Sequence, residues 1–115
     1  MSRPLTEEER SLAKWMLENG ASEGKAFLVQ LANARATSWK CSCGCASYKF
    51  KVEGMPEAPP GTHILGDFFF GSDAELSGAF IFESEGILSG VEIYGLSGAA
   101  PSVLPLPSQL RPVNA

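Results

Sequence analysis

Residues 78–96, GAFIFESEGILSGVEIYGL, decide the fold of this chain. They contain two apolar segments, 78–83 and 87–96, separated by the turn-forming residues SEG at 84–86. Short segments rich in aromatic and β-branched side chains predict strands. Two strands joined by so short a connection pair in the antiparallel direction, because a parallel pair needs a crossover of about a dozen residues or more. The stretch therefore predicts an antiparallel sheet.

Three further strands are expected upstream of this pair. Residues 62–70, THILGDFFF, form an apolar run that predicts one strand. In residues 46–53, aromatic and apolar side chains alternate with lysines, which is the period of a half-buried strand. A weaker alternation predicts a strand at 37–42. Residues 54–61, GMPEAPPG, are expected to form a loop because their prolines cannot donate hydrogen bonds to a sheet. A sheet of four to five strands is therefore expected.

The first third of the chain has a helical period instead. Residues 5–19 predict one helix, in which Thr6 and Glu9 have the spacing of a capping box. Residues 22–35 predict a second helix, with Ser22 as its N-cap. Two amphipathic helices joined by a tight turn form a hairpin that must cover another apolar surface. The predicted fold is therefore α+β, with an N-terminal helical hairpin on one face of an antiparallel sheet.

Composition indicates a single domain over residues 1–115. Hydrophobic residues make up 44% of the chain and charged residues 19%, which is enough apolar material for a core. No apolar run approaches the roughly 20 residues that span a bilayer, so no membrane partner is expected. The proline-rich tail, residues 101–115, is expected to be extended and to lie against the rest of the domain.

The cysteines and the first residues indicate the compartment. The chain starts with an acidic, amphipathic segment that lacks the apolar region of a secretory signal. Its three cysteines are an odd number within five residues, whereas a secreted disulfide framework distributes an even number along the chain. We therefore expect a cytoplasmic location.

The charges are distributed unevenly. Residues 24–52 contain five basic and no acidic side chains, and residues 53–110 contain eight acidic side chains and no Lys or Arg. The two segments either pair as neighbouring strands or present an acidic face to a basic partner. The second interpretation predicts a non-catalytic protein-interaction module, of inhibitor or immunity type or self-associating, with Glu83, Glu85 and Glu92 as candidate contacts. A protein partner or a second copy is expected, and nucleic acid is not, because the basic charges are few and dispersed.

The main chemical feature is the window CSCGC, in which Cys41, Cys43 and Cys45 occupy alternate positions. On a straight strand these thiols would be too far apart to share one metal ion. A turn at Gly44 would bring them together. Zinc usually takes four ligands, so His63, a second protomer or water would have to supply the fourth. Zinc is therefore the possible cofactor, and zinc binding is the alternative function.

Two other interpretations of the cysteines stay open at this stage. A reactive thiol needs a nearby cation or base, for which Lys40 and His63 are the available residues. Alternatively, the cysteines pack as small apolar side chains between Trp39 and Tyr48. No triad or phosphate-binding glycine loop is present, so the sequence predicts no catalytic residue and an enzyme is not the favoured class.

The window also resembles a group of small uncharacterised bacterial proteins. Those proteins share a C-x-C-G-C-x-S window after two helices and a proline-rich ending. The matching segments here are CSCGCAS at 41–47, EGILSGVEIYGL at 85–96 and LPLPSQL at 104–110. The resemblance implies a bacterial cytoplasmic domain in which the cysteine window is a family feature. It implies no activity, so no functional residue follows from it.

Overall fold

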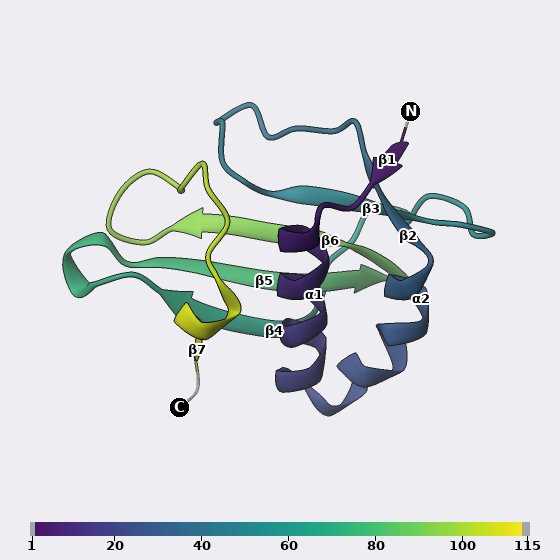
Figure 1. Cartoon of the computed structure of the whole chain (residues 1–115), viewed down its shortest axis with the longest axis horizontal. Helices are drawn as coiled ribbons and strands as arrows, with labels where there is room; N and C mark the ends of the chain where they lie inside the picture. Colours follow the sequence, from purple (N-terminus) through teal and green to yellow (C-terminus); the bar gives the residue numbers. More distant parts are fainter. Residues whose placement is uncertain (1, 114–115) are drawn as a thin grey trace.

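The computed structural model describes residues 2–113. Within them, seven strands form one antiparallel sheet in the order β1-β2-β3-β6-β5-β4-β7 (Figure 1). The strands are β1 Ser2–Pro4, β2 Ala34–Thr37, β3 Tyr48–Val52, β4 His63–Phe70, β5 Ser77–Ser84, β6 Ile87–Gly95 and β7 Arg111–Pro112. The helical segments are α1 Glu7–Asn19, η1 Ser22–Phe27, α2 Leu28–Ala32, η2 Asp73–Glu75 and η3 Pro107–Gln109. The mixed helix and strand content confirms the α+β class, with more strands than predicted.

The predicted hairpin of residues 78–96 lies at the centre of the sheet. β5 and β6 pair in the antiparallel direction from Ser77 opposite Gly95 to Ser84 opposite Ile87. The two residues between them, Glu85 and Gly86, have φ angles of 51° and 85°. Two successive positive φ angles are the mark of the tight turns that match the twist of a β-hairpin.

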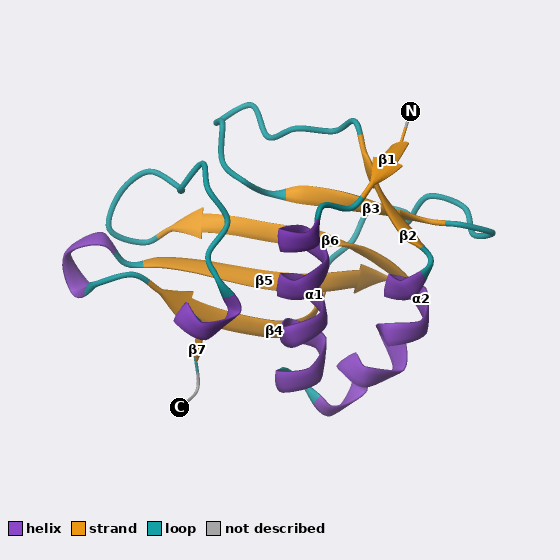
Figure 2. Cartoon of the chain, in the orientation of Figure 1, coloured by secondary structure: helices purple, strands orange, loops and turns teal. Residues whose placement is uncertain are grey.

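Helix α1 lies across one face of the sheet, over β4 and β5 (Figure 2). Its buried side consists of Leu12, Ala13, Met16 and Leu17. The strand residues below it include Leu65, Phe68 and Ile81, which are at most 1% exposed. Half-buried Trp15 adds an aromatic contact, with its ring 5.1 Å from that of Phe68. These side chains form the core that the helical period and the apolar strands predicted.

The capping box at the start of α1 is confirmed. Thr6 Oγ1 accepts a hydrogen bond from the Glu9 backbone N–H at 3.1 Å, and the Glu9 carboxylate accepts one from the Thr6 N–H at 2.9 Å. Arg3 of β1 donates to both oxygens of that carboxylate at 2.8 Å. A bidentate pair of this kind is strong as well as directional, so Glu9 joins the first strand to the first helix.

The predicted second helix, 22–35, is wrong in its type and extent, and the predicted helical hairpin is not confirmed. Residues 22–27 form a 3₁₀ helix, the α-helix covers only 28–32, and Ala34–Thr37 is strand β2. In β2, buried alanines alternate with half-buried Arg35 and Thr37, which is the period of a strand. Alanine fits both periods, and so the helical interpretation extended too far.

The predicted strand at 37–42 is also wrong. Strand β2 ends at Thr37, whose Oγ1 accepts a hydrogen bond from the Trp39 N–H at 3.2 Å. Trp39 is 39% exposed, so its place in the alternating pattern does not reflect a core position. Residues 38–47 instead form a loop between β2 and β3, which we call the cysteine loop.

The remaining differences concern the two edges of the sheet. Strands β1 and β7 are three and two residues long and each contains a proline. A period of two cannot be recognised over so few residues, and proline is tolerated at sheet edges.

The tail does lie against the domain as expected, since Leu110 is 8% exposed and Leu104 packs against the core. The end of the predicted tail, 114–115, lies outside the described residues.

Between residues 2 and 113, the structure has no helix with the length and apolar character needed to cross a bilayer.

Candidate metal centre

Hydrogen bonds hold the C-terminal end of the cysteine loop against the domain. The Ala46 N–H donates to the Pro101 carbonyl at 2.9 Å. The buried Ser47 hydroxyl accepts from the Ile93 N–H of β6 at 2.7 Å and lies 3.3 Å from the Ile93 carbonyl, to which it donates. These bonds fix the backbone on the C-terminal side of the three cysteines.

The cysteine window itself is folded into a turn. The Gly44 N–H donates to the Cys41 carbonyl at 3.1 Å, which closes a four-residue turn. Gly44 has a φ of +83°, a value that side-chain-bearing residues rarely adopt. The turn at Gly44 proposed from the sequence is therefore confirmed, and it replaces the extended backbone that would have separated the thiols.

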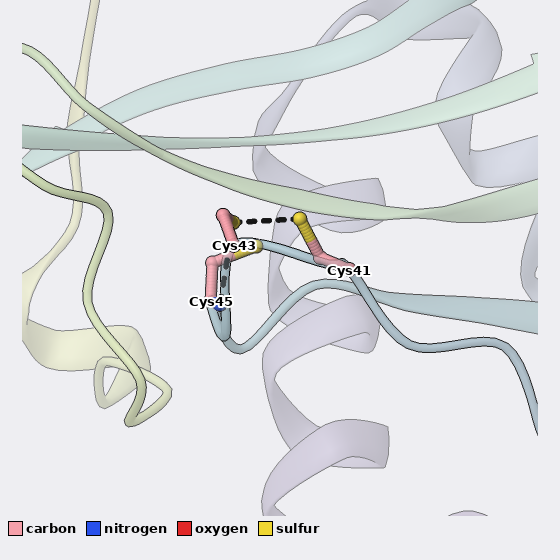
Figure 3. A group of neighbouring side chains, drawn as sticks. All are labelled: Cys41, Cys43 and Cys45. Atoms are coloured by element: carbon pink, nitrogen blue, oxygen red, sulfur yellow. Dashed lines mark hydrogen bonds between the residues drawn. The ribbon is translucent and has the colours of Figure 1, made fainter.

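The turn brings the three thiols together (Figure 3). The Sγ atoms of Cys41, Cys43 and Cys45 all lie within 4.8 Å of one another. The Sγ atoms of Cys41 and Cys43 are 2.6 Å apart, and Cys43 Sγ accepts a hydrogen bond from the Cys45 N–H at 3.4 Å. Zn–S bonds of ~2.3 Å in a tetrahedral site place sulfur atoms about 3.8 Å apart. All three thiols are therefore close enough to share one metal ion, provided that the Sγ atoms of Cys41 and Cys43 move apart by about 1 Å.

The exposure of the thiols excludes one earlier interpretation. All three cysteines are free; Cys43 is exposed, and Cys41 and Cys45 are half-buried. Cysteines that act as small apolar side chains lie in the core. Of the two aromatic residues expected beside them, Tyr48 is buried but Trp39 is 39% exposed and lies under the Lys49 amine, 4.6 Å from its ring centre. The packing interpretation of the cysteines is therefore wrong.

The environments of Cys45 and Cys43 shift the pKa values of their thiols in opposite directions. Partial burial opposes ionisation of Cys45, but hydrogen bonds from the Ser47 hydroxyl and backbone and from the other two thiols outweigh it and lower its pKa to about 7. Hydrogen bonds with the Cys41 and Cys45 thiols raise the pKa of Cys43 to about 11. Cys45 is therefore the first of these two to become a thiolate, the form that binds metals and attacks electrophiles.

Ser47 has a double role in this arrangement. The Cys45 thiol lies 3.1 Å from the Ser47 hydroxyl and donates to it while protonated. Once Cys45 ionises, the hydroxyl can donate to the sulfur only by leaving the Ile93 carbonyl. The sequence interpretation missed this residue, although a serine two positions after the last cysteine was part of the quoted window.

The thiols border a cavity of about 740 Å³. Cys41 and Cys45 line it, together with Trp39, Lys40 and the ion pair of Arg3 with Glu9. Among the described residues, no carboxylate is within ion-pair distance of the Lys40 amine. The cavity therefore gives solvent and small molecules access to two of the three sulfur atoms.

His63 lies outside the group formed by the three cysteines. Its Nδ1 is 2.5 Å from a Glu83 carboxylate oxygen, and its Nε2 is 3.7 Å from Glu23. The hydrogen bond with Glu83 is the main cause of the raised pKa of the imidazole. The group of residues able to share a metal ion consists of the three cysteines, without His63.

The three glutamates of the predicted interaction surface also have separate environments. Glu83 binds His63 and accepts a hydrogen bond from the Gly86 N–H at 2.7 Å. Glu85 is exposed in the turn between β5 and β6. Glu92 lies opposite Phe80 in the sheet, and by strand alternation both point away from the buried side of Ile81 and Ile93. Their interaction role stays a prediction.

Comparison of the chain with protein-family models, with curated proteins and with solved structures gives no match.

Proposed function

We propose that the chain binds one thiophilic metal ion through Cys41, Cys43 and Cys45. The observation that carries this proposal is the convergence of three free Sγ atoms within 4.8 Å in an exposed turn. Thiolates are soft ligands that favour zinc, cuprous ion and iron–sulfur clusters over hard cations such as magnesium and calcium. An iron–sulfur cluster normally takes four cysteines, so a single ion fits this chain better.

The loop supports binding by pre-forming the ligand set. The backbone that positions the sulfur atoms is fixed by the turn at Gly44 and by the contacts of Ala46 and Ser47 with the domain. A ligand set that is already ordered loses less conformational entropy when the ion binds. Because only thiolates bind, each thiol that joins the metal releases its proton, and metal affinity therefore rises with pH.

The direct test is native mass spectrometry of untagged protein purified without a chelator. We expect an excess mass of one metal ion per chain that disappears when the protein is denatured, with the element identified by inductively coupled plasma mass spectrometry. A bare mass, both after purification and after incubation with Zn²⁺ or Cu⁺ under reducing conditions, would rule out the proposal.

Variants distinguish the ligands from their neighbours. Cys43→Ser removes an exposed side chain and should abolish stoichiometric binding without unfolding the domain. Ser42→Ala is the matched control, because it changes an exposed residue in the same turn that supplies no sulfur. Equal metal content in the two variants would contradict the assignment of Cys43 as a ligand.

A second candidate, the protein-interaction function, is supported by the aromatic side chains on the face of β5 and β6 that points away from helix α1. The Phe80 ring lies 5.6 Å from that of Phe82 and 5.9 Å from that of Tyr94, and all three residues are half-buried. Sedimentation equilibrium tests self-association of this face. Glu92→Lys, beside Phe80, should weaken association by about tenfold, whereas Glu85→Lys in the turn should not. A protein that is monomeric at all concentrations would contradict self-association.

A further inference from the structure

We propose that the ion held by the cysteine loop is cuprous copper, Cu(I), bound by three thiolates and by no fourth protein ligand. This inference rests on the proposed function and specifies its metal. The structure argues against zinc, the ion considered first from the sequence. Trivalent arsenic, which also bonds to three sulfur atoms, is distinguished from Cu(I) by the titration below.

The number of ligands is the first argument. Among residues 2–113, the group with metal-ligand spacing contains three sulfur atoms and no His, Asp or Glu. A structural zinc site uses four protein ligands. Cu(I) has a filled d shell and no demand for a fourth ligand, and soft sulfur donors are the ones it prefers. Three thiolates therefore satisfy Cu(I) and leave zinc incomplete.

The polar groups nearest to the thiols are already engaged, which is the second argument. The Ser47 hydroxyl bonds the Ile93 N–H and carbonyl. The Glu9 carboxylate, which lines the same cavity, is bound by Arg3 and by the Thr6 N–H. His63 lies outside the cysteine group and is held by Glu83. A zinc ion would therefore depend on water from the cavity for its fourth ligand, as catalytic zinc does.

The net charge of the metal–thiolate group, in contrast, favours zinc over Cu(I). Three thiolates leave a net charge of −1 around Zn²⁺ and −2 around Cu⁺. In a buried site the larger charge would be strongly disfavoured. Here the side chain of Cys43 is exposed, the other two are half-buried, and Lys40 adjoins Cys41 in the chain. Water at the exposed sulfur screens the excess charge, so ligand number and softness decide the preference.

The shape of the loop is the third argument. All three ligands come from five consecutive residues, closed by one backbone hydrogen bond between Gly44 and Cys41. The three Sγ atoms lie within 4.8 Å of one another, and a shift of about 1 Å at the Cys41–Cys43 contact would allow all three to bind one ion. Such a short loop can arrange three sulfur atoms around an ion in one plane or in a shallow pyramid. No His, Asp or Glu of residues 2–113 joins these three sulfur atoms to complete a tetrahedron.

The test is a pair of anaerobic competition titrations on the reduced full-length protein. Cu(I) is competed with bathocuproine disulfonate, Zn(II) with 4-(2-pyridylazo)resorcinol, and arsenite is titrated separately against the thiols. We expect one Cu(I) per chain, a Cu K-edge absorption spectrum showing three sulfur neighbours, and a far higher affinity for Cu(I) than for Zn(II). Each single Cys→Ser variant should lose more than about 100-fold in Cu(I) affinity, above the 10–100-fold typical of losing an outer-shell partner. His63→Ala should leave the affinity unchanged.

The outcomes separate this inference from the proposed function. A four-coordinate zinc site, or tighter retention of zinc or arsenite than of Cu(I) after correction for the competitors, overturns the copper assignment while the thiolate site stands. A loss of Cu(I) affinity in His63→Ala, or an absorption spectrum with a nitrogen neighbour, also overturns it, because the ion would then have a fourth protein ligand. Binding of none of the three ions overturns both proposals.

Discussion

The central strands and the cysteine loop of this domain are held in place by different kinds of interaction. In β4 and β5, Leu65, Phe68 and Ile81 are at most 1% exposed, and their positions are set by contact with α1. In the cysteine loop, Cys43 is exposed and the backbone is positioned by individual hydrogen bonds. Stability therefore comes mainly from the sheet, and the candidate chemistry lies where little apolar surface is buried. Except at Ser47, which bonds the loop to β6, this separation predicts that substitutions in one region leave the other largely unaffected.

The largest expected effect is in the core. Phe68→Ala removes a buried ring that contacts Trp15 at 5.1 Å, and large-to-small substitutions of this type cost about 3–5 kcal/mol of unfolding free energy. Urea unfolding monitored by circular dichroism measures the loss. Val103→Ala is the control, because Val103 is 74% exposed and should change stability by less than about 0.5 kcal/mol. Equal effects of the two substitutions would contradict the assignment of Phe68 to the core.

Ser47→Ala acts on both regions and should have the next largest effect. It removes the acceptor of the buried Ile93 N–H, which costs about 1–3 kcal/mol. It also removes a hydrogen bond that stabilises the Cys45 thiolate, so the pKa of Cys45 should rise above about 7. Chemical unfolding and the pH dependence of iodoacetamide alkylation measure the two effects. Ser42→Ala should change neither, and a lower stability without a change in alkylation would show that Ser47 is only an anchor.

The sequence was sufficient to predict the helices and strands in which several residues follow one pattern. The capping box at Thr6, the alternation in 46–53 and the hairpin in 78–96 each involve several residues that indicate the same structure, and all three are present. Short strands with a proline, such as β1 and β7, do not have enough residues for a period. The alanines of β2 are compatible with a helical period as well as with a strand period, so the sequence pattern there does not separate the two structures.

The site was predictable only in part, for a similar reason. The spacing of the cysteines and the presence of Gly44 were sufficient to anticipate a turn. The partners of Ser47 and His63 were not predictable, because they depend on sheet register. Ile93 and Glu83 are 46 and 20 residues away along the chain. His63 pairs directly with Glu83 across β4 and β5, and this pairing explains why the histidine is not near the thiols.

A smaller effect is expected at Gly44. An alanine there meets no atom within 4 Å, so its only cost is the strained φ of +83°, about 1 kcal/mol. Gly98→Ala is the matched control, since Gly98 also has open space around it but no positive φ. The distinguishing measurement is metal affinity: Gly44→Ala should weaken binding and Gly98→Ala should not. Unchanged affinity in Gly44→Ala would show that the turn does not need to be pre-formed for the thiols to meet.

The smallest effect is the pH dependence of stability that arises from the thiols of the metal-free, reduced protein. The pKa of Cys45 is lowered in the folded state from an ordinary value of about 9 to about 7, so its stabilising contribution is complete above pH 9 and is lost as the pH falls through 7. The contribution of Cys43 to stability depends on pH in the opposite direction. Its pKa is raised to about 11, so its contribution is complete below pH 9 and is lost as the pH rises through 11.

The two contributions together predict a shallow maximum of thiol-dependent stability near pH 9. The difference in unfolding midpoint between the wild type and Cys45→Ser should grow from pH 7 to pH 9, and that between the wild type and Cys43→Ser should shrink from pH 9 to pH 11. Both differences should be small, because Cys43 is exposed and Cys45 is only partly buried, and groups that contact water interact weakly. Large differences at all pH values would mean that the cysteine loop contributes to the core after all, and the separation of stability from chemistry would then be wrong.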